Sequence, residues 1–232
     1  TADNTKPVIN MSGTDIPNPA DFSDLEGNVT NDIKLTLTQD GQDIVLEGLT
    51  NNITLDLPSI QKFIVTSTAD VTIEKVVSNS WPTSITAKNV TFTGTTYNSV
   101  SINVEETATF NGGTYNNEVA VVGSEDDAEA VINGGLFNHN FKSSVDTTIK
   151  GGLLPSVDAD GNGVADYMLI MNAGKTLTVE KADEPFGPLF STSGAGCKLV
   201  YDTQDIRDFY SGLIVGNWSL SLIHISEPTR LD

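Results

Sequence analysis

Cationic residues are scarce in this chain of 232 residues, which has 12 Lys and Arg against 31 Asp and Glu and a formal net charge of −19. Binding to nucleic acid needs clustered cations that displace counterions from phosphates, so this composition excludes an ordinary nucleic-acid partner. The same charge disfavours docking on an anionic membrane surface. The sequence has no run of about 20 apolar residues, so we expect no membrane insertion within it.

Cysteine and aromatic residues are also few. A lone cysteine, Cys197, excludes a framework of intrachain disulfides, and aromatic residues make up 7% of the chain. Thr, Asn, Gly, Ser and Val are abundant instead, a profile that favours a turn-rich all-β protein over a helical one. The length fits one large domain or two small ones, with enough apolar residues for a core.

A repeat runs through the middle of the sequence. Its clearest copies share an apolar anchor, a glycine two residues later and a second apolar residue five residues after the anchor; they lie at 90–98, 108–116, 130–138 and 147–155. The anchors are Leu37, Leu55, Ile73, Phe92, Phe110, Ile132 and Ile149, with steps of 18, 18, 19, 18, 22 and 17 residues. A further match, Leu177-Thr178-Val179, follows after a step of 30 residues.

The residue before each anchor is threonine in six of the seven copies, and the residue before that is mostly apolar. This alternation predicts short strands with the anchors inside and the threonines outside. The step is too short for a helical-pair repeat of about 34 residues or a propeller blade of about 40. We therefore predict an all-β, right-handed parallel β-helix over residues 33–180, with about 18 residues per coil and irregular flanks.

Glycine and asparagine recur after each anchor. The glycines Gly94, Gly112, Gly134 and Gly151 are expected at corners with a strained or left-handed backbone. The asparagines Asn98, Asn116 and Asn138 are expected to stack as an amide ladder at the next corner.

Three segments carry a resemblance to a known group of proteins: 111–115 (Asn-Gly-Gly-Thr-Tyr), 133–137 (Asn-Gly-Gly-Leu-Phe) and the strand 173–179. They resemble the β-helix segments of large secreted and surface proteins of gut bacteria. The resemblance covers about Ile33 to Val179. It implies an extracellular or cell-surface location and agrees with the predicted fold. Such repeats serve many roles, so it implies no particular activity.

The flanks differ from the repeat. Residues 1–32 are rich in Pro, Asp and Asn and are interpreted as an irregular lead-in or partial cap. Residues 181–219 are interpreted as a truncated C-terminal element, with a short helix starting near Asp205. The run from Leu220 to Arg230 resembles the in-frame translation of a sequencing-library adapter. We therefore interpret residues 220–232 as a non-native tail and the chain as a metagenomic fragment.

An aspartate-rich stretch predicts a metal site in an insertion at 155–170. Oxygen ligands at positions 1, 3, 5, 7 and 9 of a loop, with Gly163 for its sharp turn, are typical of calcium binding. The predicted ligands are Asp158, Asp160, Asn162, the backbone carbonyl of Val164, and Asp166. Leu169 stands where an EF-hand has glutamate, so the loop instead resembles the shorter calcium loops of secreted bacterial and thrombospondin-type repeats. A solvated turn without metal is the alternative.

Other candidate motifs favour structural interpretations. The acidic segment Glu125–Glu129 fits a solvated loop tip better than a general acid–base pair. The sequence around Lys175 lacks the earlier glycine of a phosphate loop. His139 and Cys197 have no partners at a catalytic spacing. The threonine row is flanked by residues of mixed charge, which argues against an ice-binding lattice.

These observations favour a non-catalytic structural or adhesive segment of a secreted or cell-surface bacterial protein, with a surface glycan or host protein as possible partner. A carbohydrate-active lyase or hydrolase is the main alternative. It would use the outward carboxylates of Asp56 and Glu74, with Trp81 and Tyr97 stacking on sugars, although basic partners are sparse. A phage tail-spike-like virion module is the second alternative.

Overall fold

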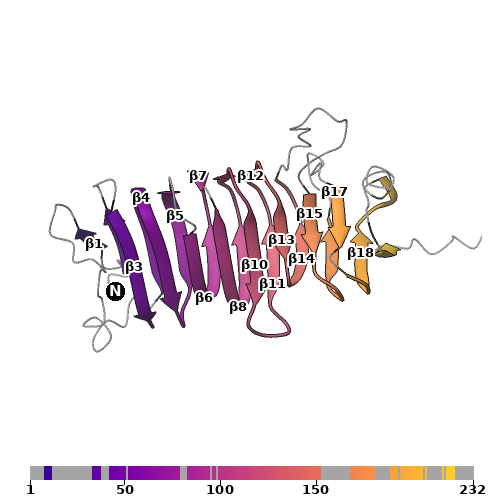
Figure 1. The fold of residues 1–232 in the computed structure, drawn as a ribbon, viewed down its shortest axis with the longest axis horizontal. Coiled ribbons are helices and arrows are strands. Elements are labelled where there is room, and N and C mark those ends of the chain that lie inside the picture. Colours follow the sequence, from indigo (N-terminus) through magenta and orange to yellow (C-terminus); the bar gives the residue numbers. More distant parts are fainter. Residues whose placement is uncertain are drawn as a thin grey trace, which may run out of the picture.

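The computed structural model describes residues 8–11, 33–37, 42–50, 52–78, 83–94, 96–97, 99–152, 168–180, 189–192, 194–205, 207, 216 and 218–222. Nearly all of its elements are strands, and they pair in parallel. The strands lie side by side along the long axis of the molecule in chain order (Figure 1). The parallel β-helix predicted from the repeat is therefore confirmed.

Three rows of strands, which we name faces A, B and C, form the solenoid. Face A has the order β1 (Val8–Met11), β2 (Ile33–Leu37), β4 (Ile53–Ser67), β5 (Val71–Ser78), β6 (Thr83–Phe92), β8 (Val100–Phe110), β11 (Glu129–Ile132), β14 (Asp146–Ile149), β16 (Thr176–Val179), β18 (Cys197–Tyr201) and β19 (Trp218–Leu222). Face B joins β3 (Gln42–Leu49) to further parts of β4, β6 and β8, then to β10 (Val119–Gly123), β13 (Phe141–Ser143), β15 (Met168–Met171) and β17 (Leu189–Thr192). Face C comprises β7 (Thr96–Tyr97), β9 (Thr114–Tyr115) and β12 (Leu136–Phe137).

The register of face A reproduces most of the predicted alignment. The residues paired in successive strands are Leu55, Ile73, Phe92, Phe110, Ile132, Ile149 and Val179. The first predicted anchor is wrong, because β2 pairs Leu35, not Leu37, with Leu55. Thr36 therefore lies opposite Asp56 and outside the predicted threonine row. A slip of two residues keeps the strand alternation in phase, so the sequence pattern alone could not detect it.

Aromatic rings cluster in the core of the middle coils. Phe92 and Phe110 stack with their ring centroids 5.2 Å apart, and Tyr115 stacks on Phe137 at 4.7 Å. Phe110 also meets Tyr115, Phe137 and Phe141 edge to face, at 5.7, 5.9 and 5.4 Å. Phe110 thus joins the rings of all three faces. Aliphatic anchors such as Leu55 and Ile73 continue the same core toward the N-terminal coils.

A few polar side chains enter the core, and most have a hydrogen-bond partner. Thr147 occupies an inward position beside Ala130 and donates to the Ser143 Oγ at 2.8 Å. Ser143 Oγ also accepts from the amide of Val145 at 3.3 Å, which closes a tight turn between faces B and A. Thr83 differs: it is fully buried, and its hydroxyl has no partner among the described residues. Burying an unpaired hydroxyl is costly, so Thr83 is a weak point of the core.

The paired glycines turn the chain from face A to face C, and each member of a pair has a different role. The second glycine has positive φ, as in Gly113 (103°) and Gly135 (110°), which side-chain-bearing residues avoid. The first glycine leaves no room for a Cβ. Such an atom on Gly134 would lie 2.8 Å from the carbonyl oxygen of Asn111 in the preceding coil. Gly112, Gly134 and Gly151 thus lie at corners as expected, but the left-handed backbone belongs to the glycine that follows each of them, and the first glycine is required for close coil stacking.

Parallel pairing extends beyond the repeat found in the sequence. Strand β1 joins β2 on one side, and β18 and β19 follow β16 on the other. The chain is helical at Gln204, Asp205 and Arg207, in the region where a short helix was expected. The origin of residues 220–232 stays a prediction, and Leu220–Leu222 form the end of β19.

Candidate functional surface

A row of threonines, which we name the threonine row, lies on the outside of face A. Its threonines are Thr54, Thr72, Thr91, Thr109, Thr148 and Thr178; Val131 interrupts the row between Thr109 and Thr148, and each residue pairs with the next in register. All are partly exposed. Adjacent strands are about 4.8 Å apart, so the row presents hydroxyl groups at a regular spacing on a polar sheet surface.

A second outward row, which we name the corner row, comprises Asn52, Asp70, Asn89 and Asp146. Each residue stands directly before an apolar–Thr–apolar triplet, or at the equivalent place, where face B meets face A. Asn52 accepts from the amide of Asp70 at 3.1 Å, and the Asn89 side chain donates to the Asp70 carboxylate at 2.9 Å. The Asn89 carbonyl then accepts from the amide of Thr107 at 2.9 Å. In a later coil, Asp146 accepts from the amide of Thr176 at 2.7 Å. Each side chain thus binds the next coil.

The corner row was not predicted from the sequence, although its pattern is visible there. An asparagine or acidic residue stands directly before several triplets, as in Asn52-Ile-Thr-Leu, Asp70-Val-Thr-Ile and Asn89-Val-Thr-Phe. Such side chains favour positions where they can bind a neighbouring backbone group. The spacing could have predicted this row from the same alignment that predicted the threonines.

An ion pair lies beside the corner row. Lys88 Nζ is 3.2 Å from Glu106 Oε1, and Asn89 donates to Glu106 Oε2 at 3.1 Å. The pKa of Glu106 is lowered because Asn89 and Lys88 donate to its carboxylate. The pKa of Lys88 is raised, chiefly by its hydrogen bond to Glu106 and by the negative charge there. Both groups are solvated, so the pair contributes little stability.

Asparagines also pair at the corners of face C. Asn138 donates to Asn116 at 3.0 Å, which confirms that part of the predicted amide ladder. Asn98, its third predicted member, lies outside the described residues. Asn133 donates to Asn111 at 2.8 Å, which forms a second ladder next to the glycine corners. Both ladders join neighbouring coils rather than converge on a common point.

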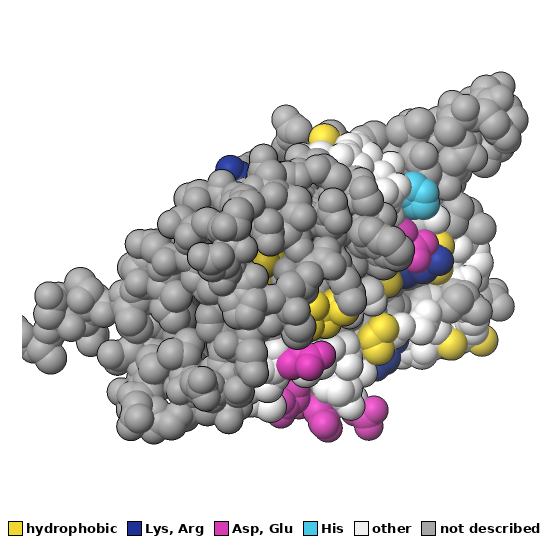
Figure 2. All heavy atoms as spheres, turned by 60° about the vertical axis from the view of Figure 1, so that its left-hand side comes forward, with side chains coloured by type: hydrophobic (Ala, Val, Ile, Leu, Met, Phe, Trp, Pro, Cys, Tyr) yellow, Lys and Arg dark blue, Asp and Glu magenta, His cyan; other side chains and the backbone are white. Residues whose placement is uncertain are grey.

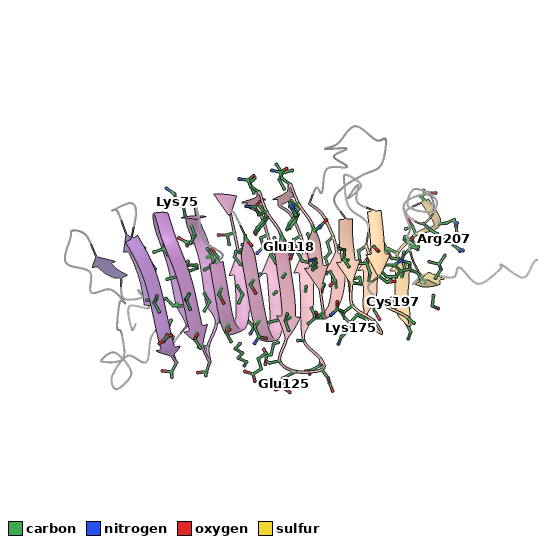
Figure 3. The ribbon with its side chains drawn as sticks, in the orientation of Figure 1. Lys75, Glu118, Glu125, Lys175, Cys197 and Arg207 are labelled. Carbon is green, nitrogen blue, oxygen red and sulfur yellow. The ribbon has the colours of Figure 1, made fainter. Side chains whose placement is uncertain are left out.

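The acidic segment forms an exposed tip between β10 and β11. Glu125, Asp126, Asp127 and Glu129 are all exposed, and Figure 3 shows Glu125 on a loop that projects from the edge of the solenoid. Figure 2 shows acidic side chains grouped along one margin of the visible surface. Among the residues with described positions, no three His, Cys, Asp or Glu side chains are arranged to hold a metal ion. This geometry agrees with a solvated loop tip.

The two carboxylates considered for an enzyme do not lie opposite each other. A β-bulge interrupts the pairing of β4 with β5, so Asp56 lies opposite Lys75 rather than Glu74. The sequence places each carboxylate directly after its anchor, Leu55 or Ile73, but the bulge takes the two out of register. Trp81 and the Tyr97 side chain, the proposed sugar-stacking groups, lie outside the described part of the structure.

The other residues considered for function in the sequence, Cys197, Lys175 and His139, lie in core or turn positions. Cys197 is buried on β18, and its thiol donates to the carbonyl of Asn172 at 3.0 Å. Gly174 has a φ of 77° in the turn before β16, and Lys175 continues into that strand rather than into a helix. His139 lies partly buried in the turn between β12 and β13. These positions suit turn and core residues.

The predicted calcium ligands Asp158, Asp160, Asn162, Val164 and Asp166 lie outside the described residues. Calcium binding at this loop therefore stays a prediction. No helix in the described part of the chain has both the length and the hydrophobicity to cross a membrane. Comparison with protein-family models, curated proteins and solved structures gives no match to this chain.

Proposed function

We propose that this chain is a non-catalytic, structural or adhesive segment of a secreted or cell-surface bacterial protein. The main support for this proposal is that outward polar side chains bind to adjacent coils. The asparagine ladders and the corner row act in this way, and so do the ion pairs Lys142–Glu118 (2.7 Å) and Lys150–Glu180 (3.4 Å). Groups committed to coil-to-coil contacts hold adjacent coils in register and are poorly placed to transfer protons to a substrate.

The polar surface also suits a segment that extends into solvent. The threonine row and the acidic tip keep a long β surface hydrated, and negative charge opposes edge-to-edge association of such surfaces. Hydroxyl and amide groups in regular rows can exchange hydrogen bonds with sugar hydroxyls or with a host protein. We therefore propose a surface glycan or a host protein as the partner class.

An assay of polysaccharide cleavage distinguishes a non-catalytic segment from a carbohydrate-active enzyme. The purified chain is incubated with neutral and acidic polysaccharides while new reducing ends and unsaturated products are measured, and retention on the same immobilised polysaccharides is scored in parallel. We expect no turnover, with or without retention. Turnover that disappears in Asp56→Asn or Glu74→Gln, but persists in the matched variant Glu47→Gln, would establish the enzyme instead.

The oligomeric state of the chain distinguishes the proposed structural segment from a phage tail-spike-like virion module. Sedimentation analysis of the intact chain should show no stable trimer, whereas a stable trimer would favour a tail-spike-like assembly. The proposed location is tested on the complete reading frame. We expect an export signal or a surface anchor there, and a complete frame with neither would contradict it.

Calcium is a separate proposal with its own test. If Asp158–Asp166 bind the ion, a chelator should lower the midpoint of thermal unfolding, and added calcium should restore it, because ligand binding to the folded state alone raises stability. Asp160→Asn should lose this response. An unchanged midpoint after chelation would eliminate a stabilising site without bearing on the proposed rod.

A further inference from the structure

Two Asn-Gly-Gly corners occupy equivalent positions in successive coils. They are 111–113 and 133–135, and the residues before them, Phe110 and Ile132, pair in register on face A. The two asparagines share the same two following residues, so their local chemistry in an unfolded chain is closely matched. A third Asn-Gly pair, Asn162–Gly163, lies outside the described residues.

An asparagine followed by glycine can modify itself, since glycine has no side chain to obstruct the approach of its backbone nitrogen. That nitrogen loses its proton to solvent and attacks the Cγ of asparagine. A new N–C bond closes a five-membered succinimide, and the side-chain amide leaves as ammonia. Water then opens the ring to give aspartate or isoaspartate. The reaction needs no reagent besides water and a proton acceptor.

Hydrogen bonding distinguishes the two corners. The amide of Gly134, which would attack Asn133, donates to the carbonyl of Phe110 at 3.0 Å. The amide of Gly112, which would attack Asn111, has no such bond to any residue of the described structure. An amide held by an acceptor must release it before it can attack, so the coil stack restrains the reaction at Asn133.

The asparagine ladder acts in the same direction. Asn133 donates from its Nδ2 to the Oδ1 of Asn111 at 2.8 Å. A donor at this oxygen draws electron density from the Asn111 Cγ, which makes that carbon more open to attack by Gly112. Asn133 uses its own leaving group as the donor, which holds that nitrogen in place. Both asparagine side chains are solvent-accessible, so water can reach either ring.

We propose that Asn111 is a site of spontaneous deamidation in the folded protein and that Asn133 is protected from it by the solenoid. An aspartate at 111 still accepts from Asn133 and forms a charge-assisted hydrogen bond, so the ladder survives. An isoaspartate lengthens the main chain immediately before Gly112. There is no spare room here, because even a Cβ on Gly112 would lie 2.8 Å from the Thr93 carbonyl oxygen. The isoaspartyl form should therefore loosen this corner.

The experiment compares the two sites within one protein. The intact chain is held in mildly alkaline buffer, and digestion with mass spectrometry follows the amide-to-acid change at Asn111 and Asn133. A parallel sample is unfolded in urea. In the folded chain we expect modification roughly fivefold faster at Asn111, as the loss of one net hydrogen bond implies. In urea the two sites should react at similar rates.

Internal controls make the result decisive. Asn116 and Asn138 form the same kind of ladder without a following glycine, so they should stay unmodified. The variant Asn133→Asp removes the donor to Asn111 and should slow modification there in the folded chain only. Equal rates at both sites in the folded chain would overturn the proposal. So would a preference for Asn111 that persists in urea, because local sequence would then explain it.

Discussion

Replacing Phe110 by alanine tests the register of the solenoid most directly. The side chain is fully buried and meets four aromatic rings, with centroid distances between 5.2 and 5.9 Å. Thr109 is its neighbour on β8 and points to the opposite side of the sheet, where it is partly exposed. The two positions share one strand and differ in the face that they occupy, so Thr109→Ala is the matched control.

The expected difference is large. Truncating a buried phenylalanine removes transfer free energy and leaves a cavity, which together cost about 3–5 kcal/mol. The edge-to-face and stacked contacts of Phe110 place this site toward the upper end, since aromatic pairs add about 0.5–1.5 kcal/mol beyond area burial. Thr109→Ala removes one outward hydroxyl and some β-propensity, and should cost no more than about 1 kcal/mol.

Urea unfolding followed by far-UV circular dichroism measures both variants. Phe110→Ala should shift the midpoint strongly, while Thr109→Ala should stay near the parent. Because solenoids bind mainly nearest neighbours, Phe110→Ala could also split the transition, which would lower the apparent m value. Phe110→Leu should recover much of the loss by refilling the cavity. Equal destabilisation by the alanine variants at 109 and 110 would refute the assigned register.

Three further predictions concern single positions. Gly134→Ala should destabilise by about 1–3 kcal/mol, because its Cβ would press on a backbone oxygen of the preceding coil. Gly94→Ala should be near neutral in the same urea assay, because its added methyl group would meet no described atom within 4 Å beyond its chain neighbours. Thr83→Val should stabilise by about 1 kcal/mol in thermal or urea unfolding, since it removes a buried hydroxyl that has no partner in the described part of the chain, at nearly constant volume; a loss of stability would contradict this. Burial raises the pKa of Tyr201 to about 12, whereas its value in the unfolded chain is about 10. Between these two pH values only the unfolded state releases the proton, so the free energy of unfolding should fall as pH rises. Tyr201→Phe should remove that part of the alkaline decline, and an identical decline in both proteins would contradict the prediction.

The sequence predicts the coil architecture well because stacking imposes one chemical requirement on many positions. Every anchor from Leu55 to Val179 must be apolar to fill the interior, and the alternate positions must tolerate solvent. A period that recurs under such a constraint is visible without any structure. Where the constraint weakens, as in β2, the pattern fits two registers equally well, and the first anchor was misplaced by two residues.

Contacts between coils were harder to predict. The first glycine of each pair is required by a carbonyl oxygen of the preceding coil, since a Cβ on Gly151 would clash with the carbonyl oxygen of Asn133. A glycine kept for space and a glycine kept for positive φ are identical in sequence. Likewise, the bulge that sets Asp56 opposite Lys75 depends on pairing geometry, which the periodic pattern does not encode.

The last strand shows that strand pairing and burial are separate properties in a solenoid. β19 continues face A in register, with Leu220 beside Leu199, although Leu220 belongs to the segment that resembles a translated adapter. Leu199 is fully buried, whereas Leu220 is 46% exposed; of the same strand, Trp218 packs partly buried against the core. The end of a parallel stack presents free backbone groups, and an alternating run such as Leu-Ser-Leu can bind them whatever its origin. Backbone pairing alone therefore does not show that a strand evolved as part of the stack. Burial is the stronger criterion, because removing apolar side chains from water supplies the dominant part of the free energy that holds the rod together.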